Sequence, residues 1–253
     1  MRVVSLFSRK GGVGRTVFAV NLAAILSEQG LKVAVLELDP QNIVSQHFDG
    51  FNEQTIGWAH TLLDPRRPSA ITSESYWSPR ENLRVFPFGK ITAAQRKAIT
   101  RQLDEQPHWL ERALLSPVFD GIDVLFIDTP SGFNAYSDHA ERVATSALSI
   151  WLCDAASQKA FTGSDVRVLP NGCQHRHILN QINASKSSRR ELLKSWRELV
   201  GEELLPLPIH QDELVSDALL EGKAVVWFAS FSQAAHDLLG LANWMRSEWL
   251  SDA

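Results

Sequence analysis

A glycine-rich run near the start of the chain constrains the fold more than any other feature. It reads Arg9-Lys10-Gly11-Gly12-Val13-Gly14-Arg15-Thr16, with an apolar stretch from Val3 to Phe7 before it and a helical pattern after it. Glycines allow positive φ, so successive N–H groups can point at one oxyanion, and the positive end of the following helix is directed at the same place. The run therefore predicts a loop that closes a buried strand and holds the phosphates of a nucleotide.

Two positions of this run depart from the common phosphate-loop pattern G-x-x-x-x-G-K-[ST]. Arg9 stands at the first glycine, Arg15 stands at the lysine, and Lys10 is an additional cation at the second position. Thr16 matches the pattern and is expected to offer its hydroxyl to Mg²⁺ held between the phosphates. A guanidinium keeps the charge of the lysine but is a planar fork with a different reach, so Arg15 counts against hydrolysis more than against binding.

Apolar runs alternate with amphipathic stretches along the rest of the chain, as in parallel sheets whose strands are buried on both faces. We predict strands at Val3–Ser8, Lys32–Leu38, Leu83–Phe86, Val124–Ile127, Leu148–Leu152 and Ile178–Ile182. We predict helices at Val17–Glu28, Gly57–Leu63, Thr92–Asp104, His108–Leu114, Ser188–Val200, Asp212–Glu221 and Phe231–Trp249, and a long loop at Asp64–Asn82. With 253 residues, 44% of them hydrophobic, we expect a single α/β domain over residues 1–253, built on a mostly parallel twisted sheet flanked by helices.

Composition and charge limit the functions open to the chain. No apolar stretch approaches the roughly 20 residues that span a bilayer, and the N-terminus lacks a charged-then-apolar leader. The two cysteines, Cys153 and Cys173, give no disulfide framework, so we expect a cytoplasmic protein. A net charge of −4 argues against extensive nucleic-acid binding, which needs a basic face. The basic stretch from Lys186 to Arg197 is better explained as a solvated helix start.

Polar residues stand at the carboxyl ends of three predicted strands, where parallel sheets bind their ligands. Asp39 follows the second strand, Asp128 closes the strand from Val124, and Asn180 ends the last apolar run. An amide such as that of Asn180 can both donate to and accept from a nucleotide base. Each residue could instead cap a turn or a helix. The phosphate loop favours a ligand site for the two aspartates, whereas for Asn180 the two interpretations stay balanced.

The loop from Lys10 to Thr16 resembles the deviant Walker A motif of the ParA/MinD class of ATPases. In that class the early lysine reaches across a dimer interface to the partner's nucleotide, so the resemblance implies this catalytic role for Lys10. It also implies that Asp39 positions or activates the attacking water and that Asp128, the Walker B carboxylate, holds Mg²⁺ through its water shell. Asn180 would contact the base.

Four further segments narrow the resemblance to the BcsQ family, accessory proteins of bacterial cellulose biosynthesis. They are Gly57-Trp58-Ala59 with Leu62-Leu63-Asp64, Leu83 to Gly89, Leu205 to Glu213, and Leu241 to Trp244. The resemblance covers nearly the whole chain and implies a P-loop NTPase fold with ATP and Mg²⁺ as cofactors. It further implies a nucleotide-dependent homodimer and slow ATPase that joins the inner-membrane cellulose secretion complex. There it would act with the synthase and cytosolic regulatory subunits in assembly, localisation or regulation.

Three alternatives stay open. A partition or positioning ATPase would use the same pocket, but it needs a basic face for DNA or a cationic terminal helix for a membrane. The last helical stretch instead carries the apolar stripe Leu238, Leu241, Met245 and Trp249, which core packing explains better. A scaffold that binds ATP without hydrolysing it would fit Arg15. Lastly, Cys173, His175 and His177 alternate along a strand and could face one zinc ion, although no fourth ligand completes the site.

Overall fold

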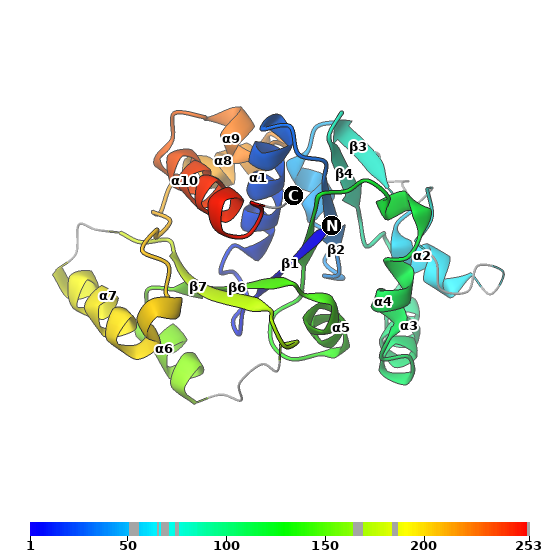
Figure 1. Cartoon of the computed structure of the whole chain (residues 1–253), viewed down its shortest axis with the longest axis horizontal. Helices are drawn as coiled ribbons and strands as arrows, with labels where there is room; N and C mark the ends of the chain where they lie inside the picture. The colour runs from blue at the N-terminus through cyan, green and yellow to red at the C-terminus, as the bar shows by residue number, and fades with distance from the viewer. Residues whose placement is uncertain are drawn as a thin grey trace.

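A seven-stranded sheet organises the chain (Figure 1). This computed structural model describes residues 1–50, 56–64, 66, 71–73, 76–163, 169–183 and 187–251. The strands lie in the order β3-β4-β2-β5-β1-β6-β7. Their bounds are β1 (Arg2–Phe7), β2 (Val33–Glu37), β3 (Trp77–Arg80), β4 (Leu83–Phe86), β5 (Val124–Asp128), β6 (Ser146–Leu152) and β7 (Gln174–Asn180). Every neighbouring pair is parallel except β3 with β4, so the predicted mostly parallel α/β fold is confirmed.

Helices cover both faces of this sheet (Figure 1). One face packs against α1 (Arg15–Glu28), α8 (Leu214–Leu220), α9 (Val225–Phe228) and α10 (Gln233–Glu248). The other packs against α2 (Trp58–Leu63), α3 (Ala93–Glu105), α4 (Trp109–Ala113) and α5 (Ala135–Val143). Beside the β6–β7 edge lie α6 (Ala155–Thr162) and α7 (Ser187–Val200). The 3-10 helices are η1 (Val44–His47), η3 (Pro117–Phe119) and η4 (Gly201–Glu203).

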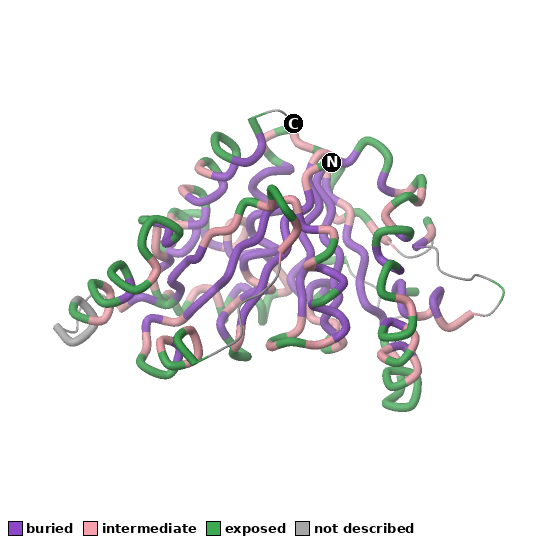
Figure 2. Tube along the Cα trace, turned by 60° about the horizontal axis from the view of Figure 1, so that its bottom comes forward, coloured by how far each residue is buried: buried purple, intermediate pink, exposed green. Residues whose placement is uncertain are grey.

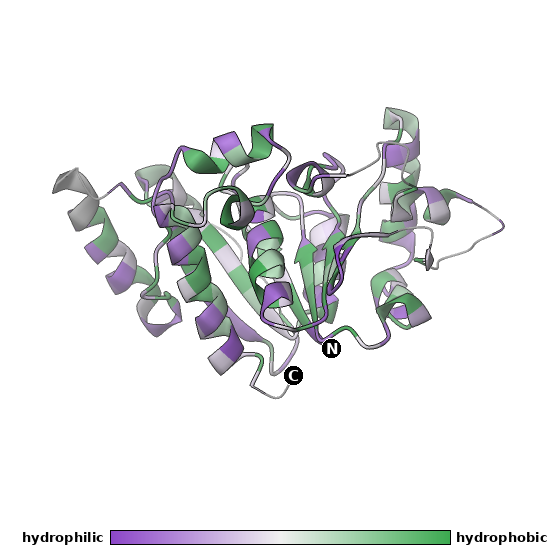
Figure 3. Cartoon of the chain, turned by 90° about the horizontal axis from the view of Figure 1, so that it is seen from above, coloured by the Kyte–Doolittle hydropathy of each residue, from purple (hydrophilic) through white to green (hydrophobic). Residues whose placement is uncertain are grey.

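Successive side chains of each strand point to alternate faces of the sheet, which explains how two helical layers can pack on one sheet. In β1, Val4 and Leu6 pack into the core that contains α1 and α10, whereas Val3 and Phe7 pack into the core on the opposite face. Successive side chains of a strand point to opposite faces, so a strand that is apolar throughout supplies both cores. Figure 2 shows the resulting buried interior, and Figure 3 shows mostly hydrophobic residues along the strands and a mixture of hydrophobic and hydrophilic residues along the helices.

Several predicted boundaries are wrong. The expected loop Asp64–Asn82 contains β3, an antiparallel edge strand, while its residues 65, 67–70 and 74–75 lie outside the described part. Strand β7 ends at Asn180 and includes polar residues, because an edge strand can pair along β6 without being apolar throughout. The apolar pattern does not predict the short helices α5, α6 and α9. Lys186, in the basic stretch, also lies outside the described part.

Helix α10 is a core helix. Leu238, Leu241, Met245 and Trp249 are all buried, in the cluster that also contains α1, so the core interpretation of this stripe is confirmed. No helix within the described ranges combines the length and the apolar character needed to cross a membrane.

Candidate nucleotide site

The glycine-rich run forms the loop between β1 and α1. Gly12 and Gly14 have positive φ, of 71° and 95°. The positive φ favours glycine at position 14, and a Cβ there would lie 2.6 Å from Nδ2 of Asn180 and displace that amide. The loop lines a hollow of about 370 Å³ together with Glu37 and Asp39 from the carboxyl end of β2. The sheet therefore brings the loop and the end of β2 to one place.

Thr16 and Asp128, the residues expected to hold Mg²⁺, are brought together by α1 and β5. Thr16 Oγ1 donates to Asp128 Oδ2 at 2.7 Å, while the buried Oδ1 of Asp128 has no hydrogen-bond partner among the described residues. Burial is the main cause that raises the pKa of Asp128 to about 7, against the opposing effects of Thr16 and Arg15. A divalent cation would favour the ionised carboxylate and give Oδ1 a partner, so these residues fit magnesium.

Asp39 has both carboxylate oxygens engaged inside the chain. Oδ1 accepts the backbone N–H of Gln41 at 2.9 Å, and Oδ2 lies 3.7 Å from Nη2 of Arg15. The guanidinium also donates to Oγ of Ser8, whose hydroxyl in turn donates to the carbonyl oxygen of Lys10 at 2.7 Å. Arg15 is thus turned toward the base of its own loop and the end of β2, and it is 9% exposed.

Glu37 is a site residue that is not among those predicted from the sequence. Its Oε1 accepts the backbone N–H groups of Ile43 at 2.5 Å and Val44 at 2.9 Å, which ties down the segment that follows Asp39. Burial is the main cause that raises the pKa of Glu37 to about 8, and the charge of Asp128 adds to it. The position of this acid, two residues before Asp39 at the end of β2, is the signal that could have identified it.

Lys10 points away from the phosphate hollow of its own chain. Its Nζ lies 3.0 Å from Oδ2 of Asp154, with 43% of the lysine side chain exposed, and it is absent from the lining of the hollow. Asp154 caps the N-terminus of α6 by accepting the N–H of Ser157 through Oδ1 at 2.6 Å. The two residues lie 144 positions apart and no short motif links them, so this pair could not be predicted from the sequence.

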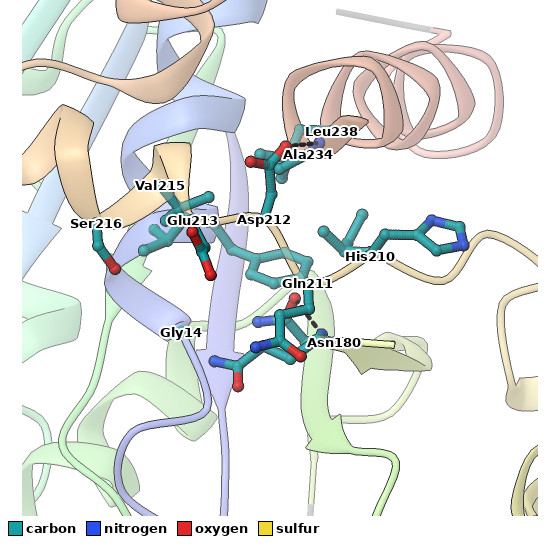
Figure 4. A pocket seen from close by; sticks show the side chains of 14 residues that line it. Gly14, Asn180, His210, Gln211, Asp212, Glu213, Val215, Ser216, Ala234 and Leu238 are labelled. Atoms are coloured by element: carbon teal, nitrogen blue, oxygen red, sulfur yellow. Dashed lines mark hydrogen bonds between the residues drawn. The ribbon is translucent and has the colours of Figure 1, made fainter. Parts of the chain in front are cut away.

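Asn180 ends β7 in the wall of a second hollow, of about 210 Å³ (Figure 4). Its Nδ2 donates to the carbonyl oxygen of Val13 at 2.7 Å, and its Oδ1 accepts the N–H of Gln181 at 2.8 Å. An amide has two N–H donors and two lone pairs, so one of each remains beyond these bonds. The two hollows share the lining residues Gly14, Val17, Gln181, Val215 and Ser216 and are therefore adjacent.

The proposed zinc residues do not converge as a set of three. Within the described ranges, His175 and His177 group with Glu203, their ligand atoms lying within 4.8 Å of one another, and Cys173 is not part of the group. Trp151 Nε1 donates to Nδ1 of His177 at 3.0 Å, so the neutral ring carries its proton on Nε2, which lies 3.6 Å from Glu203. A metal on Nε2 would have to displace this proton, so the hydrogen bonds favour a polar network over zinc.

Comparison with known proteins identifies relatives over nearly the whole chain. The family model described as cellulose biosynthesis protein BcsQ matches residues 1–245. The cellulose biosynthesis protein BcsQ of Salmonella typhimurium is 27% identical over 257 residues, which cover 96% of this chain and 94% of the relative.

Solved structures share the fold. The septum site-determining protein MinD of Pyrococcus horikoshii, complexed with Mg-ADP, has a TM-score of 0.72 at 21% identity and covers 99% of this chain and 97% of its own. Cobyrinic acid a,c-diamide synthase of Mycobacterium smegmatis, with bound ADP and magnesium, has a TM-score of 0.76 at 20% identity. The match covers 100% of this chain and 97% of the synthase chain. At such identities the likeness establishes the P-loop fold and nothing finer. Because the family model spans almost the entire sequence, the chain belongs to the BcsQ family of cellulose biosynthesis proteins.

Proposed function

We propose that this chain is an ATP- and Mg²⁺-binding accessory protein of the bacterial cellulose secretion complex that dimerises in its ATP-bound state. It acts in the assembly, localisation or regulation of that complex, with the synthase and cytosolic regulatory subunits as partners. It is a cytoplasmic protein recruited to the complex at the inner membrane, so its association with the membrane is indirect.

One observation carries the nucleotide part of this proposal. The phosphate loop, the Thr16–Asp128 pair and Asn180 come from β1, β5, α1 and β7, yet they line or adjoin two adjacent hollows at the carboxyl ends of the strands. This is where parallel sheets bind ligands, so the hollow at the loop would take the phosphates and the hollow at Asn180 would take the base of a nucleotide. The solved MinD structure of the same fold holds Mg-ADP.

The exposed ammonium of Lys10 supports the dimer. It lies outside the lining of the phosphate hollow of its own chain, and its pair with Asp154 is at the surface, where a second copy could compete for the ammonium. Two chains that meet over two nucleotides would stabilise the ATP-bound state, and ATP would stabilise the dimer, by reciprocal linkage.

A scaffold that binds ATP without turning it over is the second candidate. The observation in its favour is that Arg15 faces Asp39, the residue expected to position water, with both side chains nearly buried. ATP retained unhydrolysed in a purified dimer would favour the scaffold, whereas steady release of phosphate would favour the ATPase.

Nucleotide binding predicts thermal stabilisation. At Mg–ATP of about 100 times the dissociation constant, the native state should gain roughly 2.7 kcal/mol. For a chain of this size the melting temperature should then rise on the order of 5–10 °C. Differential scanning calorimetry with ATP, ADP and GTP checks this, and Thr16→Ala and Asp128→Ala should lose most of the magnesium-dependent part. A melting temperature unchanged by all three nucleotides would contradict the proposal.

Asp39 is expected to act in hydrolysis more than in binding, because it closes β2 beside the phosphate hollow. If the wild-type chain hydrolyses ATP, Asp39→Ala should bind ATP and accumulate as an ATP-bound dimer. Phosphate release and size-exclusion chromatography with light scattering measure the two properties. Equal hydrolysis rates in both proteins would remove the catalytic role, whereas no hydrolysis in either would support the scaffold.

A further inference from the structure

Arg15 occupies the position that the common phosphate-loop pattern gives to a lysine, but its partners are groups of the chain itself. Nη1 donates to Oγ of Ser8 at the end of β1, and Nη2 lies 3.7 Å from Oδ2 of Asp39 beyond β2. The side chains of Arg15 and Asp39 are 9% and 11% exposed. The guanidinium therefore links the start of the phosphate loop to Asp39, the residue expected to position the attacking water.

The same guanidinium lies beside the space in which phosphates would bind. Arg15 and Asp39 both line the hollow of about 370 Å³. Nε of Arg15 is buried and has no hydrogen-bond partner within the described part of the chain. A guanidinium has five N–H donors in a rigid fork, so it can exchange one carboxylate for phosphate oxygens while it keeps another partner. A lysine offers its three donors from one nitrogen, so its partners must gather around a single point, whereas the guanidinium fork reaches partners on two sides.

The charges around Arg15 determine how it would respond to a bound phosphate. Asp39 lines the hollow and Asp128 adjoins it, and Arg15 is attracted by both carboxylates. Without nucleotide, the ion pair compensates part of this negative charge. An incoming phosphate carries more negative charge and competes with Asp39 for the one guanidinium between them.

We propose that Arg15 is a positioning residue that exchanges partners. In the nucleotide-free chain it holds Oδ2 of Asp39, and on nucleotide binding it turns to the phosphates and releases that oxygen. Asp39 is then held by the N–H of Gln41 alone, with Oδ2 free to accept a hydrogen bond from water. This inference rests on the proposed nucleotide site and adds to it a built-in link between phosphate occupancy and the state of Asp39.

A double-mutant cycle on ADP binding tests the exchange without any catalytic turnover. In the wild-type background, Asp39→Asn should tighten ADP binding about tenfold, because Arg15 no longer has to leave a carboxylate, a factor that corresponds to about 1.4 kcal/mol. In the Arg15→Gln background the same change should alter binding by about twofold or less. Direct repulsion between Asp39 and the phosphates acts in both backgrounds and cancels in the cycle. Isothermal titration calorimetry gives the four dissociation constants, and equal factors in the two backgrounds would overturn the proposal.

Asp120→Asn is the matched control for the loss of a carboxylate. Asp120 is exposed and precedes β5, at the end of the sheet opposite to the hollow. The control should leave ADP affinity unchanged in both backgrounds. An effect as large as that of Asp39→Asn would mean that net charge, rather than the pair, controls binding, and the exchange would be wrong.

A second double-mutant cycle measures urea unfolding without nucleotide. It distinguishes the absence of the Arg15–Asp39 pair from the absence of the nucleotide site. The Arg15–Asp39 pair predicts that the double variant loses less stability than the sum of the two single losses, since either single change leaves one buried charge without its partner. Additive losses would show that the pair is not formed and would refute the exchange. If ADP binds to none of the four proteins, the proposed function fails, and the unfolding cycle still decides whether the pair exists.

Discussion

Lys10→Ala is expected to abolish ATP-dependent dimerisation while ATP binding remains measurable. The backbone N–H groups of the loop, Thr16 and Asp128 are unchanged in this variant, so the nucleotide keeps its own site. What is lost is the ammonium that each chain would offer to its partner in the proposed dimer. A hydrogen bond to a charged group contributes about 1.5–3 kcal/mol, and a symmetric dimer has two of them, so the dimer should weaken by a factor of about 100 or more.

Sedimentation velocity with and without Mg–ATP measures the dimer, and calorimetry measures the affinity for nucleotide. Asp154→Asn is the matched control, because it removes the charge that Lys10 faces within its own chain but keeps an oxygen to cap α6. This control should dimerise at least as well as the wild type. If Lys10→Ala still dimerises with ATP as the wild type does, Lys10 does not act across the interface. Association with the cellulose synthase subunits should fall together with dimerisation.

The elements that the sequence predicted well are those with a strong local signal. Strand β1, the loop and α1 follow from an apolar run, glycines at defined positions and a helical pattern, all within about thirty consecutive residues. The predicted ends of the second strand at Leu38 and of the fourth at Ile127 each lie one residue from the observed ends of β2 at Glu37 and β5 at Asp128, because each apolar run stops beside a carboxylate. Because parallel strands point the same way, these ends could be placed at one edge of the sheet from the sequence alone.

What the sequence did not predict depends on contacts between distant residues. Helices α5 and α6 begin at the caps Asn134 and Asp154, but they are short, and tertiary packing decides whether such segments become helical. Strand β7 includes His175, which bonds to Ser149 across the strand pair, and the apolar pattern does not reveal this pairing. The direction of the Arg15 side chain could not be predicted either. Its acceptors, Ser8 and Asp39, follow different strands and come together only in the folded chain.

Glu37→Gln is expected to remove a large pH dependence from the stability of the nucleotide-free protein. The pKa of Glu37 is raised from 4.5 to about 8 in the folded chain, mainly by burial. Below pH 4.5 the group is protonated in both states. As the pH rises toward 8, the unfolded chain loses this proton while the folded chain keeps it, so stability falls by about 1.4 kcal/mol for each unit between the two pKa values. The total reaches several kcal/mol, the full loss being present above the folded pKa.

Comparing the variant with the wild type isolates the effect of Glu37 together with its coupling to Asp128, whose pKa burial also raises. Burial lowers the pKa of His47 to about 4 and that of His177 to about 3, so these residues make stability rise with pH, but they are present in both proteins and cancel. The variant should match the wild type near pH 4.5 and exceed it increasingly up to pH 8 in urea unfolding. Glu105→Gln, at a side chain 67% exposed, is the control and should give a difference that does not change with pH.

A pH-independent difference for Glu37→Gln would mean that the buried acid is not held in its protonated form. The expected outcome has a functional counterpart, because glutamine keeps an oxygen for the N–H groups of Ile43 and Val44. The variant should therefore preserve the segment after Asp39 while it removes an ionisable group from the acidic surroundings of Asp128. A gain in stability on this change would show that the chain gives up stability to keep a carboxyl group beside the proposed nucleotide site, as active sites commonly do.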